Sequence, residues 1–83
     1  MKRVSAEILD LKTKNKAEYL FVRITVKAED FYCIYSENGG RAFECLGNDF
    51  DEAKRKFEIL SDNEVSATHL ADVLNDMRNE IFA

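Results

Sequence analysis

One histidine and two cysteines are the side chains in this sequence best suited to chemistry. His69 precedes Asp72 by three residues, so on a helix the carboxylate would lie one turn from the imidazole and could orient it as a general base. His69 also follows Ser66 by three residues, and a residue in that position often returns a hydrogen bond toward the helix cap. We expect the structural role for His69, which leaves His69 and Asp72 as secondary polar candidates for a site.

Cys33 and Cys45 are expected on neighbouring strands of a hairpin that turns at Gly39-Gly40. Counting outward from a two-residue turn there pairs Cys33 with Leu46, so the thiols would be near neighbours but not partners. Two thiols and one distant histidine do not form a recognisable zinc set, and no Ser-His-Asp set accompanies them. We therefore expect buried free thiols, and no catalytic, cofactor-binding or metal-binding residue.

Two further patterns could indicate ligands. Gly39-Gly40 could form a phosphate loop, but no P-loop Lys-Ser/Thr and no G-x-G-x-x-G spacing accompanies these glycines, so a tight turn is the better interpretation. Asp72, Asp76 and Glu80 recur every four residues and could form a docking surface on the last helix. A solvated helix face explains the same spacing.

Four strands and two helices must position these residues. Alternation of apolar and polar residues predicts strands over about 2–12, 18–27, 31–37 and 41–46, and spacing near 3.6 predicts helices over about 50–61 and 67–82. The order ββββαα predicts an α+β fold in one domain over 1–83: a four-stranded antiparallel meander sheet followed by two helices packed on one face.

Local signals mark three boundaries within this order. The apolar positions change parity at Ile8-Leu9, which predicts a bulge in the first strand. Asp49 and Glu52 have the spacing of a capping box at the start of the first helix. The second helix is expected to start after a Ser66 cap, because its neighbours Val65 and Leu70 have the spacing of a hydrophobic staple.

The strand over 19–27 has the clearest alternation, and we expect it to be central. Its even positions are aliphatic, which predicts that they face the helices; they are Leu20, Val22, Ile24 and Val26. The odd positions begin with Tyr19 and Phe21, which should then lie on an uncovered face. The third strand adds either Phe31, Cys33 and Tyr35 or Tyr32 and Ile34 to that face. The candidate interaction surface is Tyr19, Phe21, Phe31, Cys33 and Tyr35.

Composition excludes several function classes. The chain has 83 residues with 46% apolar and 34% charged side chains, which indicates one small globular domain. A net charge of −4 argues against a nucleic-acid partner, because such partners require clustered cations. No apolar run is long enough for a membrane span, and no signal peptide pattern follows Lys2-Arg3. We expect a cytoplasmic protein, a compartment in which free thiols are usual.

Residues 65–73 carry a resemblance to a known family. The run Val-Ser-Ala-Thr-His-Leu-Ala-Asp-Val follows a strand hairpin and a helix with an acidic cap, and it resembles a family of small uncharacterised proteins from Gram-positive anaerobic bacteria. The shared pattern is a hydrophobic residue, a Ser or Thr cap, then His-Leu-x-Asp-Val, and the resemblance covers roughly residues 18–82. Members typically carry proline where Ala67 stands here. The resemblance implies a bacterial domain of unknown function with no catalytic residues to carry over.

Two function classes remain open from the sequence. The first is a non-enzymatic protein-interaction or regulatory module that uses the uncovered sheet face or the rim of the second helix, as a homodimer or with another protein partner. The second is a small-ligand binder or enzyme with a pocket near Cys33, Cys45 or His69. The first is favoured, because no set of convergent polar groups is apparent.

Overall fold

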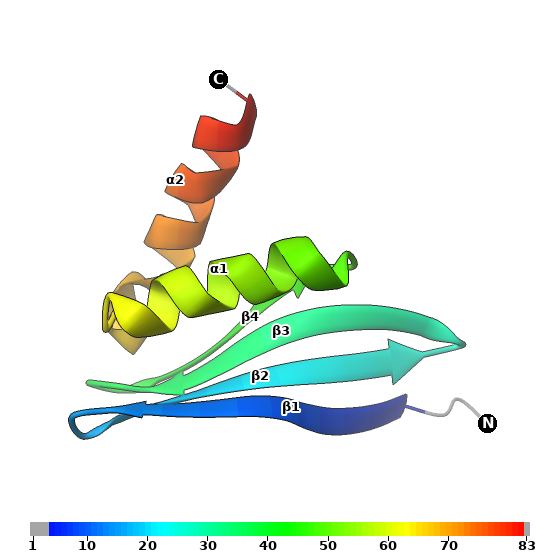
Figure 1. The fold of residues 1–83 in the computed structure, drawn as a ribbon, viewed down its shortest axis with the longest axis horizontal. Coiled ribbons are helices and arrows are strands. Elements are labelled where there is room, and N and C mark those ends of the chain that lie inside the picture. Colours follow the sequence, from blue (N-terminus) through cyan, green and yellow to red (C-terminus); the bar gives the residue numbers. More distant parts are fainter. Residues whose placement is uncertain (1–3, 83) are drawn as a thin grey trace.

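A four-stranded antiparallel sheet lies on one side of the molecule and two helices lie on the other (Figure 1). The computed structural model describes residues 4–82, with side chains described for residues 4–77. The strands follow one another in the sheet and are β1 (Val4–Lys14), β2 (Ala17–Val26), β3 (Glu29–Glu37) and β4 (Arg41–Gly47). The helices are α1 (Phe50–Asp62), the short 3₁₀ helix η1 (Ala67–His69) and α2 (Leu70–Phe82). The predicted fold class is confirmed.

β1 contains the predicted bulge. Ile8 pairs with Val22 and Asp10 pairs with Phe21, so Leu9 has no partner across the ladder. Leu9 packs against the core under the helices. Because of this extra residue, Leu11 lies on the same face as Ile8: Leu11 pairs with Leu20, which is two positions from Val22 on β2.

The two helix starts differ from each other. At α1 the predicted cap is confirmed, because the Asp49 side chain accepts a hydrogen bond from the Glu52 N–H at 3.0 Å. Before α2, Ser66 occupies the cap position of η1 but its hydroxyl accepts no backbone N–H. The chain therefore enters α2 through a 3₁₀ turn, which tightens the first part of the predicted second helix.

α1 forms the main core by crossing all four strands. It buries Ala53, Phe57 and Leu60, and the Phe57 ring lies 5.2 Å from the ring of Phe21 on β2. α2 adds Leu70, contacts β4 and η1, and then rises away from the sheet (Figure 1). The aromatic packing of α1 on the sheet is thus the principal contact between the two layers.

The prediction for the two faces of β2 is wrong. Tyr19 and Phe21 are both 0% exposed and lie under α1, whereas the aliphatic positions point to the other side. α1 covers only part of its side of the sheet, which extends past the start of α1 toward the turn between β2 and β3 (Figure 1). Arg23 and Thr25 lie in that direction, where the side chains of Glu7 and Asp30 accept their hydrogen bonds. Arg23 and Thr25 therefore mark the part of this face that α1 does not cover. The alternation of apolar and polar residues along β2 did not by itself show where that cover ends.

Hydrogen bonds fasten the hairpin loop between β3 and β4 to the linker before η1. The Asn38 amide donates to the Tyr19 hydroxyl at 3.0 Å and to the Glu64 carbonyl at 3.2 Å. The Tyr19 hydroxyl in turn donates to the Val65 carbonyl at 2.9 Å, and the Ala67 N–H donates to the Asn38 carbonyl at 2.9 Å. These contacts satisfy a buried phenol and position α2.

We predict that Tyr19→Phe destabilises the fold by about 1 to 2 kcal/mol, because it removes the buried hydroxyl that accepts a hydrogen bond from Asn38 and donates one to the Val65 carbonyl. Tyr35→Phe is the matched control, since the Tyr35 hydroxyl donates only to the exposed Glu37 side chain. Urea unfolding at one protein concentration measures both. Equal effects of the two substitutions would contradict the role given to the Tyr19 hydroxyl.

Lys54 joins α1 to the edge of the sheet by charge as well as by packing. Its ammonium donates to the Asp10 carboxylate and lies 5.4 Å from the ring centroids of both Phe21 and Phe57. The hydrogen bond from Lys54 lowers the pKa of Asp10 below its usual value. A carboxyl whose pKa is lower in the folded state stabilises the fold above its ordinary pKa, and this contribution is lost as the pH falls through the folded value.

Lys54→Met should lower the unfolding free energy at neutral pH by about 0.5 to 1 kcal/mol, since the pair is partly exposed and screened. The difference between wild type and variant should shrink as the pH falls through the lowered pKa of Asp10 in the folded wild type, because the carboxyl is then protonated in both. In an Asp10→Asn background the same substitution should lose this pH dependence. A difference that stays constant with pH would show that Lys54 acts only through packing.

Candidate functional site

The face of the sheet turned away from the helices is apolar from edge to edge. One cross-strand row joins Ile8, Val22, Cys33 and Cys45, and the neighbouring row joins Leu11, Leu20, Tyr35 and Phe43. Rows nearer the turn between β2 and β3 add further aliphatic and aromatic residues. We call the whole set the open sheet face: Val4, Ala6, Ile8, Leu11, Leu20, Val22, Ile24, Val26, Phe31, Cys33, Tyr35, Phe43 and Cys45.

Within residues 4–82, no helix packs on the open sheet face, since α1 and α2 both lie on the opposite side of the sheet (Figure 1). Its large residues at the edges are the most exposed apolar side chains, with Ile8 61% and Phe43 52% exposed. Val22 and Cys33 at its centre are 7% and 4% exposed, with their neighbours on the sheet around them. An apolar face of this extent is unusual on an isolated small domain.

Charged side chains border the open sheet face but do not enter it. At the hairpin-loop end the next row contains Glu18, Glu37 and Arg41, with the Arg41 Nε 3.4 Å from a Glu37 carboxylate oxygen. At the opposite end Glu29 pairs with Val26. The arrangement is an apolar centre with a polar rim, as at many protein interfaces.

Three of the five residues in the predicted interaction surface lie on this face together: Phe31, Cys33 and Tyr35. Tyr19 and Phe21 do not, because they belong to the core under α1. The two sides of the third strand therefore face different environments, since Tyr32 and Ile34 belong to the core. The apolar positions of β1 do not identify the core face, because their register against β2 continues the aliphatic side, which is the side that the helices leave uncovered.

Cys33 and Cys45 face each other directly across β3 and β4, which corrects the predicted offset. The hairpin loop has three residues, not two, because Asn38 is held out of the ladder by its bonds to the helix linker. Cys33 is buried as expected, but Cys45 is exposed. Burial, together with the adjacent Cys45 thiol, raises the pKa of Cys33 to about 11.

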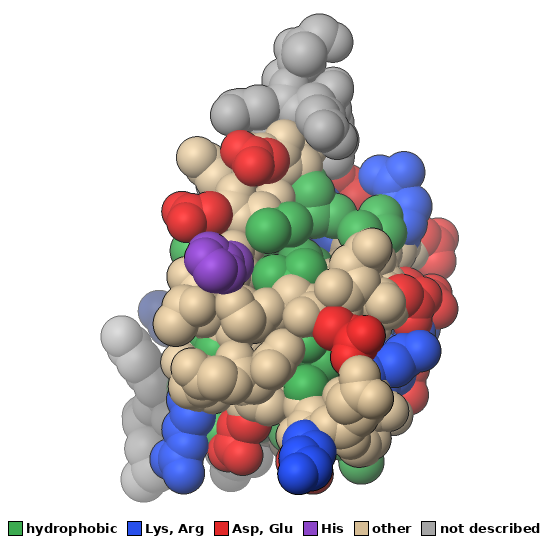
Figure 2. Space-filling view, turned by 90° about the vertical axis from the view of Figure 1, so that its left-hand side faces the viewer, with side chains coloured by type: hydrophobic (Ala, Val, Ile, Leu, Met, Phe, Trp, Pro, Cys, Tyr) green, Lys and Arg blue, Asp and Glu red, His purple; other side chains and the backbone are tan. Residues whose placement is uncertain are grey.

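His69 has a local structural contact. Its Nδ1 lies 2.8 Å from the Ser66 hydroxyl, and its backbone N–H donates to the Ser66 carbonyl at 3.0 Å. Among the described side chains no ion pair joins His69 to Asp72. His69 is exposed, and the histidine side chain (purple) stands at the surface in Figure 2. The geometry supplies no orienting carboxylate for general-base chemistry.

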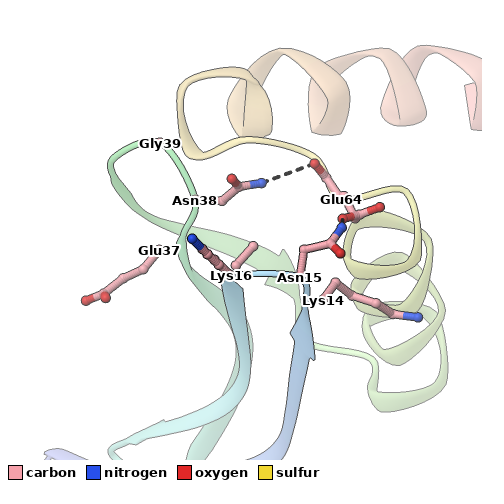
Figure 3. A pocket seen from close by; sticks show the side chains of 8 residues that line it. Lys14, Asn15, Lys16, Glu37, Asn38, Gly39 and Glu64 are labelled. Atoms are coloured by element: carbon pink, nitrogen blue, oxygen red, sulfur yellow. Dashed lines mark hydrogen bonds between the residues drawn. The ribbon is translucent and has the colours of Figure 1, made fainter.

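Polar side chains line shallow hollows at three places on the described chain. One of them, about 530 Å³, lies where the β1–β2 and β3–β4 turns meet the linker before η1 (Figure 3). There Asn15 donates to the Glu64 carboxylate and Asn38 donates to the Glu64 carbonyl. A second, about 310 Å³, lies beside β4 and is lined by Glu44, Cys45, Ala71, Asp72, Leu74 and Asn75. A third, about 350 Å³, is lined by Glu29, Asp30, Phe31, Tyr32 and Asn48.

The described part of the chain contains neither a metal-binding cluster nor a membrane-spanning helix. No group of three or more His, Cys, Asp or Glu side chains there is arranged to hold a metal ion. None of its helices combines the length and the apolar character needed to span a membrane.

Comparison with known proteins gave no match to a family model, a curated protein or a solved structure. The resemblance of residues 65–73 to a bacterial family therefore stays a prediction.

We predict that Cys45 reacts with a neutral maleimide at least about tenfold faster than Cys33 in the folded chain, since only Cys45 is exposed. The single-thiol variants Cys33→Ser and Cys45→Ser separate the two rates by mass spectrometry. Both thiols should react alike once the chain is unfolded in urea. Similar rates in the folded variants would contradict the burial of Cys33.

Proposed function

We propose that this chain is a non-enzymatic protein-interaction module that associates with a second copy of itself through the open sheet face. The observation that carries this proposal is the continuous apolar surface over all four strands, bordered by charge and without charge inside. A free thiol pair suits a reducing compartment, and we place the module in the cytoplasm as part of the same proposal.

The size of the face supports a dimer. Four strands about 4.8 Å apart, with about eight residues each at about 3.3 Å per residue, give roughly 500 Å² in projection. Protruding side chains such as Leu11 and Phe43 add accessible area. The total approaches the roughly 800 Å² that each partner contributes to a stable interface.

The chemistry of the face supports an identical partner. A flat apolar sheet needs an equally flat and apolar surface opposite it, and a second copy supplies one of the same size and twist. Two such sheets can pack face to face as a β-sandwich, with strands within about 30° of alignment. The exposed edge residues Ile8 and Leu11 would then be covered by the partner, and the charged rows would form the rim.

The alternative of a ligand-binding or catalytic pocket has weaker support. Cys45 and Asp72 line a hollow beside β4, but Cys33 and His69 are not among its lining residues. The groups named from the sequence therefore do not converge on one place. Convergent polar groups in a well-formed pocket are what such a function requires.

Ile8→Lys tests the proposal, because it places a charge within the apolar surface that the second copy would cover. Wild type should sediment as a dimer with a dissociation constant in the roughly micromolar range, and the substitution should weaken association at least about tenfold. Ile59→Lys is the matched control. Ile59 is an exposed isoleucine on α1, on the other side of the molecule, so its substitution should leave association unchanged.

Circular dichroism checks that both variants remain folded, which we expect because both isoleucines are largely exposed in the single chain. A wild-type chain that stays monomeric at about 1 mM would contradict the homodimer and leave the face to a different protein. Equal weakening by Ile8→Lys and Ile59→Lys would place the interface elsewhere.

A further inference from the structure

Cys33 and Cys45 are positioned to form a bond with each other. They are direct partners across β3 and β4, and both are free thiols. Paired residues on antiparallel strands have Cα atoms about 4.5 to 5.5 Å apart. Cysteines joined by a disulfide have Cα atoms about 4.4 to 6.8 Å apart. A bond between the sulfur atoms therefore requires rotation of two side chains and no shift of the strands.

The two thiols differ in access from solvent. Cys33 lies on the inner strand β3 and is 4% exposed, whereas Cys45 lies on the edge strand β4, is exposed and lines the hollow beside α2. A reagent in solution therefore reaches Cys45 first. Cys33 is left to react only with a group already attached at Cys45, because its neighbours on the sheet exclude larger molecules.

Acidic residues lie beside the β4 edge at Cys45. Glu44 and Asp72 line the same hollow as Cys45, and the nearby Lys56 ammonium, 3.3 Å from the Leu46 carbonyl, lies 3.6 Å from a Glu52 carboxylate oxygen. The chain as a whole carries a net charge of −4. A positively charged reagent is therefore attracted toward Cys45 and a negatively charged reagent is repelled.

We propose that Cys33 and Cys45 form a dithiol modification site that positively charged, low-molecular-weight disulfides oxidise to a cross-strand disulfide. First, the Cys45 thiolate attacks one sulfur of the small disulfide, whose S–S bond breaks and releases one small thiolate. Next, Cys33 loses its proton to solvent, and its sulfur attacks the Cys45 Sγ and releases the second small thiolate. The two small thiolates take up the two protons. The protein loses two electrons, and the small disulfide is reduced to two thiols.

The new bond would lie within the open sheet face and tie β3 to β4. This site goes beyond the proposed homodimer and does not depend on it, since both cysteines belong to one chain. A second copy on the face would only restrict access to Cys45. The reaction is therefore followed at a low protein concentration. Failure to form the disulfide and failure to form the homodimer are then separate results.

The test treats the folded chain with equal concentrations of cystamine (cationic), 2-hydroxyethyl disulfide (neutral) and oxidised glutathione (anionic). Each rate is divided by that of the same reagent with the urea-denatured chain. We expect both free thiols to disappear and the chain to lose the mass of two hydrogen atoms, fastest with cystamine and slowest with oxidised glutathione. Asp72→Asn should reduce the preference for cystamine by at least about twofold.

Single-cysteine variants separate the two steps. Cys33→Ser should stop at a mixed disulfide on Cys45, and Cys45→Ser should stay largely unreacted. A lasting mixed disulfide on the wild-type chain, or disulfides between chains instead of within one, would overturn the dithiol site. Equal normalised rates for the three reagents would overturn its assigned preference for cationic disulfides.

Discussion

A four-stranded sheet has two faces, and the helices of this chain cover one of them. α1 crosses all four strands and buries an aromatic and aliphatic cluster around Phe21 and Phe57. α2 follows α1 on the same side and then rises away from the sheet (Figure 1). Within the described residues, the strands therefore present a second apolar surface that no helix covers. Burial of that surface would be favourable, because it would remove apolar side chains from water.

The hairpin between β3 and β4 links the two sides of the sheet. Asn38 bonds to Tyr19 and to the linker before η1, so this loop keeps three residues and fixes the pairing of β4. That register sets Cys33 opposite Cys45 on the open sheet face. A contact on the helix side of the sheet thereby determines which residues meet on the other side, because a shift of register would change every cross-strand pair.

Local signals in the sequence predicted where the strands and helices lie, but they did not predict which side of each strand faces the helices. The Asp49 cap and the bulge after Ile8 could be predicted, since both depend on neighbouring residues. The orientation of β2 could not, because residues 19–22 are apolar on both parities and the choice depends on which side α1 covers. The pairing of the two cysteines depends on hydrogen bonds from Asn38 to residues far away in the sequence. Counting residues outward from the two glycines does not take these bonds into account. The interaction surface was accordingly predicted with Phe31, Cys33 and Tyr35 in place and with Tyr19 and Phe21 on the wrong side.

The most direct measurement of the central claim is an isotope-filtered nuclear Overhauser experiment on a mixture of labelled and unlabelled chains, which detects only contacts between copies. The account predicts contacts from the Val22 and Ile24 methyl groups of one copy to residues of the open sheet face in the other. Contacts between copies that involve only α1 or α2, or none in a concentrated sample, would contradict it.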